Sequence, residues 1–148
     1  PVDFTVPRGA CDCHVHVFGD PNKFPFAPDR VYTPPGASVD DLRALQAALG
    51  FERVVIVTPS VYGLDNSCTA DAIRQLGDRA RGVAVIDSST PAGALDELAA
   101  GGFTGAAGGR TAGLPCVSTG TSLPTAPSGT FAGSSRSPTS RSSSPAGP

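Results

Sequence analysis

The chain carries the run Arg53-Val-Val-Ile-Val-Thr-Pro59, in which β-branched residues follow one another with little polar alternation. Runs of this kind are typical of strands that are buried on both faces, as in a parallel sheet. A second such run, Arg81-Gly-Val-Ala-Val-Ile-Asp87, begins 28 residues after the first. This spacing suits one strand and one helix per repeat, so the two runs predict consecutive βα units.

A helix is expected directly before the first run, at residues 40–49. Its leucines recur at helical spacing and form an apolar stripe on one side. Ser38 or Asp40 can cap its first turn, and Gly50 is placed to end it.

Two further helices are expected at residues 69–76 and 91–100, the second of them with Thr90 as its N-cap. Residues 11–101 therefore follow the order β-α-β-α-β-α. This alternation predicts right-handed crossovers and an α/β fold with a parallel sheet.

The first strand of this order contains both histidines of the chain, in the run Cys11-Asp-Cys-His-Val-His-Val17. Alternate residues of a strand share a face, so the imidazoles of His14 and His16 are expected side by side, together with Asp12. The two cysteines of the run then take the opposite face, where we expect buried packing residues rather than metal ligands. Two nitrogen ligands on one face indicate the start of a metal or catalytic site.

The segment after the histidines, residues 18–35, is long, aromatic and rich in proline. Long loops in small domains are usually functional or disordered. The aromatic residues favour a folded loop over a site at the end of the histidine strand. A structural loop that covers the edge of the sheet is the alternative.

The composition changes after residue 103. Residues 1–103 hold all thirteen acidic residues and eight basic ones, whereas residues 104–148 hold three arginines and no Asp, Glu or Lys. Gly, Ser, Thr and Pro dominate the second part, which has few large apolar residues with which to offset the entropy of ordering. We therefore expect a domain over residues 1–103 and a disordered tail over residues 104–148.

The composition also bears on partners and location. Neither part has the basic patch that would indicate nucleic-acid binding. No apolar run approaches the length of about 20 residues that a membrane-spanning helix needs, and the first residues lack the apolar core of a signal peptide. We therefore expect no nucleic-acid or membrane partner, a cytoplasmic location, and four cysteines that remain thiols.

Five blocks of the chain form an ordered set: Gly9-Ala-Cys-Asp-Cys-His-Val-His-Val-Phe18, Arg30-Val-Tyr-Thr-Pro34, Asp41-Leu42, Val54-Val-Ile-Val-Thr-Pro-Ser-Val-Tyr-Gly63 with Asp65-Asn66, and Arg81-Gly-Val-Ala-Val-Ile-Asp87. Taken in order, these blocks resemble the start of an amidohydrolase-related (β/α)8 TIM barrel, of the amidohydrolase 2 type. Within that superfamily they are most similar to the 2-pyrone-4,6-dicarboxylate hydrolase (lactonase) group and the related sugar-lactone hydrolases. The resemblance implies three N-terminal βα units of a truncated barrel.

The resemblance implies that His14 and His16 are the catalytic pair of the first strand. In many amidohydrolases this pair binds a divalent metal, Zn or Mn, that activates water. In the pyrone dicarboxylate hydrolases no metal is required, and the pair contacts the substrate and helps to polarise the lactone carbonyl. A cofactor is therefore either not needed or a metal on these two residues.

The resemblance also implies that Tyr32 and Ser60 bind substrate carboxylates, with Arg30 and Tyr62 as weaker candidates. Ser60 follows the C-terminal end of a strand, the end at which barrel active sites form. The structural alternatives are capping of the strand end for Ser60 and packing of the loop for Tyr62.

The family continues into later strands, which supply another histidine and an aspartate that acts as the general base. This chain has no third histidine and no acidic residue after Glu97. We therefore expect a hydrolase of lactones by lineage, inactive as this truncated chain. The alternative is a non-catalytic fragment or a small metal-binding α/β module. A frameshift near Thr104 in a GC-rich gene would explain the tail, and a natural disordered tail is the rival explanation. Neither the lactone nor the oligomeric state follows from the sequence.

Overall fold

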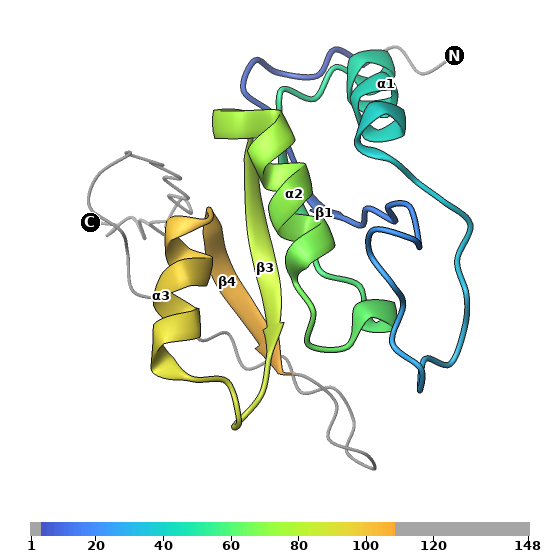
Figure 1. The fold of residues 1–148 in the computed structure, drawn as a ribbon. Coiled ribbons are helices and arrows are strands. Elements are labelled where there is room, and N and C mark those ends of the chain that lie inside the picture. Colours follow the sequence, from blue (N-terminus) through green and yellow to red (C-terminus); the bar gives the residue numbers. More distant parts are fainter. Residues whose placement is uncertain (1–3, 109–148) are drawn as a thin grey trace, which may run out of the picture.

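The structure is a computed structural model, and it describes residues 4–108. Within that range the strands form one parallel sheet in the order β1-β2-β3-β4 (Figure 1). The strands are β1 (Cys11–Val15), β2 (Arg53–Val57), β3 (Ala80–Ile86) and β4 (Phe103–Gly108). The parallel sheet built from consecutive βα units confirms the predicted fold class.

The helices between the strands are α1 (Val39–Leu49), α2 (Ser67–Leu76) and α3 (Ala92–Ala100), with short 3-10 turns η1 (Ser60–Tyr62) and η2 (Gly77–Arg79). All three predicted helices are confirmed, with ends that differ by at most two residues.

Ser38 is the N-cap of α1, as one of the two sequence alternatives predicts. Its hydroxyl accepts a hydrogen bond from the Asp41 N–H at 3.2 Å, and the Asp41 carboxylate accepts one from the Ser38 N–H at 2.8 Å. These bonds, a capping box, satisfy two main-chain donors at the start of the helix. They also hold the pKa of the Asp41 carboxyl below its usual range.

The prediction that Thr90 caps α3 is wrong. Pro91 is the N-cap residue, and it has no side-chain capping bond. The Thr90 hydroxyl oxygen instead accepts a hydrogen bond from the Asp87 N–H at 3.1 Å. The Thr90 hydroxyl therefore stabilises the turn after β3 and does not cap α3.

A fourth strand, β4, extends beyond residue 103, where the change in composition begins. Its Gly and Ala residues carry little intrinsic strand preference. Pairing with β3 forms the strand, in the register Val83↔Gly105 and Val85↔Ala107. The remainder of the predicted tail, with Cys116 and the residues on which the frameshift hypothesis depends, lies outside the described residues.

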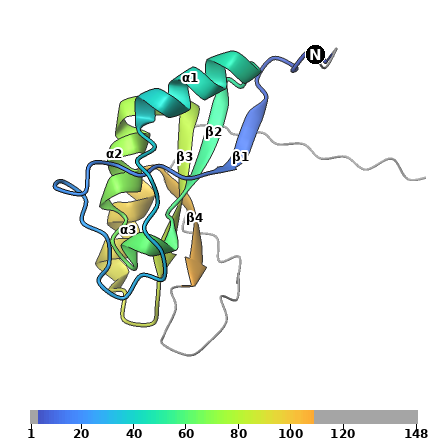
Figure 2. The same cartoon turned by 90° about the vertical axis from the view of Figure 1, so that its right-hand side faces the viewer.

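The helices α2 and α3 lie together on one side of the sheet (Figure 2). Beneath them Val54 and Ile56 of β2 are almost completely buried, whereas Val55 and Val57, which point to the other side, are half-buried. The prediction that β2 is buried on both faces is therefore wrong for the described residues, because no helix of residues 4–108 covers the second face. We call this second side the open face.

The long loop after β1 is folded, as its aromatic content predicts. An antiparallel bridge between Phe18 and Ala37 closes its base. Phe24 is buried in the core, and the ring of Phe26 packs against that of Tyr62 at a tilt of 34°, with centroids 5.2 Å apart. The loop runs beside α2 and η1 (Figure 1).

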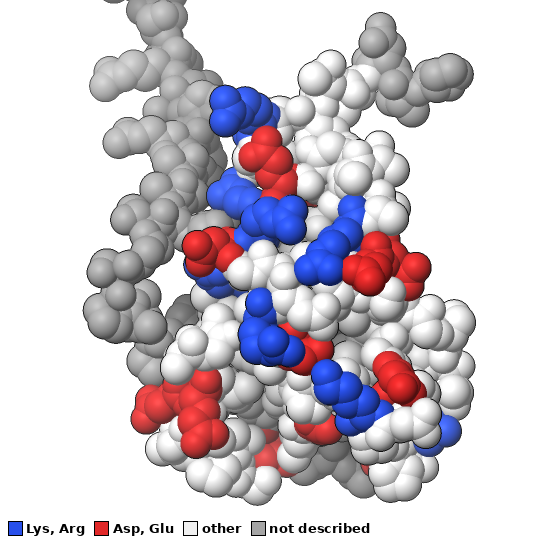
Figure 3. Space-filling view, turned by 45° about the horizontal axis from the view of Figure 1, so that its top comes forward, with Lys and Arg blue, Asp and Glu red and all other residues white. Residues whose placement is uncertain are grey.

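Ion pairs join this loop to α2 and also form on the surface of that helix. Lys23 of the loop lies 3.3 Å from the Asp71 carboxylate of α2, which also pairs with Arg74. On the side seen in Figure 3, Lys and Arg alternate with Asp and Glu rather than forming one basic area. Among the described helices, none has both the length and the apolar character needed to cross a membrane.

Candidate active site

An irregularity in β1 shapes the histidine region. The strand pairs with β2 in the register Asp12↔Val54 and Val15↔Ile56, with a register shift between the two pairs. Paired residues of parallel strands face the same side, so Asp12 lies on the side of the buried Val54. The Asp12 carboxylate accepts a hydrogen bond from the main-chain N–H of His14 at 3.2 Å. The prediction that Asp12 shares the histidine face is therefore wrong, because the bulge breaks the alternation.

The two histidines do lie together. The ring centroids of His14 and His16 are 5.2 Å apart, and the planes meet edge to face at 87°. Both side chains are exposed. This geometry agrees with the prediction that both imidazoles share one face of the strand.

His16 is fixed by the neighbouring strand. Its Nδ1 atom lies 2.8 Å from the carbonyl oxygen of Val57, the last residue of β2. A carbonyl oxygen can only accept, so Nδ1 carries the hydrogen and Nε2 of the neutral ring carries the lone pair. The β1–β2 register ends at Val15↔Ile56, so this carbonyl lies just beyond the ladder, where the ring can reach it.

The cysteines beside the histidines are less buried than predicted. Cys13 is exposed and Cys11 is half-buried. The prediction of buried packing residues is wrong for Cys13, because β1 is an edge strand of the sheet that residues 4–108 form. Partial burial and the nearby Cys13 raise the pKa of the Cys11 thiol. Cys11, Cys13 and the buried Cys68 are free thiols.

Ser60 begins η1, three residues after β2 ends, and its side chain is exposed. Within residues 4–108 its hydroxyl makes no hydrogen bond, so it can donate to a ligand. The neighbouring Thr58 behaves differently, since its hydroxyl donates to that of Thr69 at 2.9 Å in the buried interior. Neither hydroxyl caps the end of β2 through a hydrogen bond to the main chain of residues 4–108.

Tyr62 lies in the core, with 3 % of its surface exposed. Its hydroxyl accepts a hydrogen bond from the Gly19 N–H at 3.1 Å. Burial and a hydrogen bond with Cys68 raise the pKa of this phenol well above its usual range. These contacts favour the packing alternative, in which Tyr62 supports the long loop.

Tyr32 and Arg30 lie in the second half of that loop, before its closing residue Ala37. The Tyr32 side chain is 47 % exposed. Arg30 donates to the Thr33 hydroxyl at 2.9 Å and lies over the ring of Phe26. In the described part of the chain, no hydrogen bond or ring contact joins these residues to either histidine. The structure therefore brings together His14, His16 and Val57, and leaves the carboxylate-binding candidates on separate loops.

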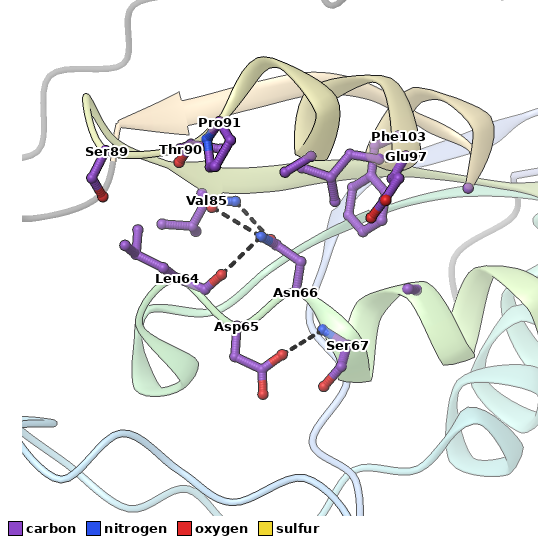
Figure 4. Close-up of a pocket in the computed structure, with 14 residues that line it drawn as sticks. Leu64, Asp65, Asn66, Ser67, Val85, Ser89, Thr90, Pro91, Glu97 and Phe103 are labelled. Atoms are coloured by element: carbon purple, nitrogen blue, oxygen red, sulfur yellow. Dashed lines mark hydrogen bonds between the residues drawn. The ribbon is translucent and has the colours of Figure 1, made fainter.

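A cavity of about 520 Å³ lies elsewhere, between α2, α3 and β3 (Figure 4). Its lining is mostly apolar and includes Leu64, Leu98 and Phe103. None of the six predicted site residues lines it. It occupies the helix side of the sheet, opposite the open face.

Comparison with known proteins identifies the family. A family model described as amidohydrolase matches residues 11–120. The chain belongs to the amidohydrolase family. It is 46 % identical over 102 residues to a 2-pyrone-4,6-dicarboxylate hydrolase of Comamonas testosteroni, a match that covers 69 % of this chain and 33 % of that protein. It is 47 % identical over 83 residues to a 4-sulfomuconolactone hydrolase of Rhizobium radiobacter, covering 56 % and 28 % of the two chains.

A solved amidohydrolase structure supports the same assignment. It is a probable 2-pyrone-4,6-dicarboxylic acid hydrolase from Acinetobacter baumannii with citric acid bound, with a TM-score of 0.61 and 30 % identity. The match covers 66 % of this chain and 36 % of that one. The chain therefore spans about a third of the length of the relatives that it matches.

Many amidohydrolases depend on a metal ion, which His, Cys, Asp and Glu side chains would have to bind. His14 and His16 offer two imidazole nitrogens, but residues 4–108 contain no group of three or more His, Cys, Asp or Glu side chains that could hold an ion. A catalytic zinc site takes three protein ligands. The described residues alone do not fit a metal centre, and we derive no step through one.

Sequence reasoning missed two residues that support this region of the amidohydrolase fold. Thr69 in α2 holds the buried hydroxyl of Thr58. Asn66, the residue before α2, makes no capping bond and instead binds the main chain of β3 (Figure 4). A polar residue before a helix is normally interpreted as an N-cap, so the sequence held no signal for this second use.

Proposed function

We propose that this chain is the N-terminal part of an amidohydrolase-family lactonase that opens a lactone of a small dicarboxylic acid. The observation that carries the proposal is the paired imidazoles of His14 and His16, with His16 held by Val57 where β2 ends. The names of its relatives, which are hydrolases of 2-pyrone-4,6-dicarboxylate and 4-sulfomuconolactone, support the substrate class.

In such a reaction a water oxygen bonds to the lactone carbonyl carbon, and the ring C–O bond breaks. Negative charge develops on the carbonyl oxygen, and a donor aimed at that oxygen lowers the barrier. His14 suits this role, because its ring nitrogens make no hydrogen bond within the described residues. The bond from Nδ1 of His16 to Val57 leaves Nε2 of that ring for a ligand atom.

The attacking water must also lose a proton to a base. The described carboxylates near the strand ends are already engaged. Asp12 accepts from the His14 main chain, and Asp87 accepts from the N–H and hydroxyl of Ser89. The latter bonds hold the pKa of the Asp87 carboxyl below its usual range, which makes it a weak base. We therefore expect substrate binding without turnover by this chain alone.

Carboxylate recognition is assigned to exposed polar groups on the loops that follow β1 and β2. We assign the substrate carboxylates to Ser60, Tyr32 and Arg30, with Tyr62 supporting the loop that carries the last two. A guanidinium with an exposed side can bind a carboxylate through two hydrogen bonds. The relative with citric acid bound supports a site for a small polycarboxylate.

The second candidate is a non-catalytic fragment. The engagement of Asp12 and Asp87, the described carboxylates near the strand ends, favours it. A metal-binding module has less support, because residues 4–108 supply only two imidazole ligands. We also propose a cytoplasmic location, which suits the free thiols of Cys11, Cys13 and Cys68.

The test is a titration of the full 148-residue chain with 2-pyrone-4,6-dicarboxylate, followed by the ring resonances of the two histidines. We expect saturable shifts of both, with no loss of pyrone absorbance. The parent 2-pyrone, which lacks the carboxylates, is the matched control and should cause no shift. Unchanged histidine resonances at saturating ligand would refute the proposal. Turnover that His14→Ala abolishes would instead show that this chain is a complete enzyme.

A further inference from the structure

The peptide unit that joins Val57 to Thr58 is held on both sides. The Thr58 N–H donates to the carbonyl oxygen of Val83 in β3 at 3.0 Å. The Val57 carbonyl oxygen accepts from Nδ1 of His16 at 2.8 Å. A trans peptide is planar, with its N–H and C=O pointing in opposite directions. The bond to β3 therefore aims this carbonyl away from β3, toward β1 and His16.

The side chain of Thr58 is fixed from the helix layer. Its hydroxyl donates to the Thr69 hydroxyl at 2.9 Å, and the two residues are 3 % and 0 % exposed. Buried hydroxyls keep a partner because an unpaired one costs free energy. Threonine also has few rotamers, so a bonded Thr58 holds the backbone around it closely. Thr69 lies on α2, far along the chain from the histidine that it influences.

We propose that Thr58 and Thr69 are positioning residues, which act through the Val57–Thr58 peptide to hold His16 as the Nδ1–H tautomer with Nε2 free on the open face. The inference rests on the proposed role of His16 in the site. It explains the orientation of His16 by a buried pair of hydroxyls, those of Thr58 and Thr69, on the opposite side of the sheet. It also predicts which nitrogen of His16 meets the substrate.

The two hydroxyls differ from the surrounding apolar core. The buried hydrophobic cluster includes Ile56, two residues before Thr58, and Ala72, three residues after Thr69. Valines of nearly the same shape at both positions would fill the same space and leave no buried hydroxyl unpaired. A role limited to packing would therefore tolerate valine at both sites, whereas a positioning role requires the hydroxyls.

The test is the tautomer of His16, read from the 15N resonances of the full chain at about pH 8.5, where an ordinary imidazole is neutral. We expect one tautomer, with the hydrogen on Nδ1 and a clear separation between the two nitrogen resonances. His14 is the only other histidine, so it serves as an internal control in the same spectrum. A hydrogen on Nε2, or averaging between tautomers, in the unaltered chain would overturn the inference without any variant.

Thr69→Val then tests the relay. We expect the two His16 nitrogen resonances to move toward each other, while those of His14 stay unchanged. Thr69→Ser keeps the hydroxyl and should restore the wild-type spectrum. Thr58→Val is a second route to the same result if Thr69→Val fails to fold. A folded valine variant with an unchanged His16 tautomer would contradict the inference. Because no ligand is added, failure here is distinguishable from failure of the lactone titration.

Discussion

The side-chain amide of Asn66 bonds both main-chain groups of Val85. The Val85 N–H donates to Oδ1 at 2.8 Å, and Nδ2 donates to the Val85 carbonyl at 2.9 Å (Figure 4). The β2–β3 register ends at Val57↔Val83, so Val85 lies beyond the reach of β2. Asn66 therefore continues the ladder in place of a strand residue.

Replacement of Asn66 tests this relationship. Asn66→Leu leaves both groups of Val85 without their partner, and we expect a loss of about 1–3 kcal/mol in the free energy of unfolding. The Val85 amide should also exchange with solvent faster than its neighbours. Asn22→Ala is the control, because Asn22 is exposed and bonds only Asp20 nearby. Equal stability of the two variants in urea unfolding would contradict the assigned role.

A glycine in β3 is required by close packing. A Cβ atom at Gly82 would lie 2.6 Å from Ile73 Cδ1 and 2.6 Å from Phe103 Cδ1. We expect Gly82→Ala to destabilise the chain by about 1–3 kcal/mol through overpacking. Gly93 in α3 has open space around the same position. Gly93→Ala should therefore stabilise the chain by up to about 1 kcal/mol and raise its thermal midpoint. A lower thermal midpoint in both variants would refute the packing argument.

The two faces of β2 predict unequal costs of truncation. Val54 is 1 % exposed under the helices, and Val55 is half-buried on the open face. Val54→Ala should cost about 2 kcal/mol, from two buried methyl groups and the space they leave. Val55→Ala should cost clearly less. Equal losses in urea unfolding would mean that the open face is covered by other parts of the chain.

Acid should loosen the contact between the long loop and α2. Bonds from Arg74, Gln75 and Lys23 lower the pKa of the Asp71 carboxyl. The Asp71 carboxylate thus binds a proton more weakly in the folded chain than in the unfolded chain. The stabilisation is complete above the ordinary aspartate pKa of about 3.9, and it is lost as the pH falls through the lowered value.

Asp71→Asn should remove that part of the acid dependence in urea unfolding at a series of pH values. The size of the effect is expected near the upper end of the range for surface pairs, about 1 kcal/mol. Asp40→Asn is the matched control, since Asp40 pairs with Arg43 but its side chain is 86 % exposed. An unchanged pH profile in Asp71→Asn would show that the loop is held by its aromatic contacts alone.

The sequence predicted the parts of the fold that depend on local patterns. The β-branched runs at residues 53–59 and 81–87 fixed the strands, and the capping residue Ser38 fixed the start of α1. The pairing of His14 and His16 followed from strand geometry. Each of these depends on residues close together in the chain.

Features that depend on distant contacts were missed or misplaced. Asp12 does not share the face of the histidines, because β1 contains a bulge that no pattern of residues predicts. β4 forms from Gly and Ala because β3 offers a free edge. Thr69 and Asn66 act on strand ends that lie near them only after folding. In each case the deciding partner belongs to another element.

The central claim is that His14 and His16 serve lactone hydrolysis when the rest of a barrel is present. The most direct measurement is hydrolysis of 2-pyrone-4,6-dicarboxylate by a chimera, in which residues 11–108 replace the matching segment of the Comamonas testosteroni relative. We predict loss of pyrone absorbance with the chimera, and a rate at least tenfold lower after His14→Ala or His16→Ala, equivalent to about 1.4 kcal/mol or more of barrier. A folded chimera that leaves the pyrone intact, or one whose rate is unchanged by both substitutions, would contradict the account.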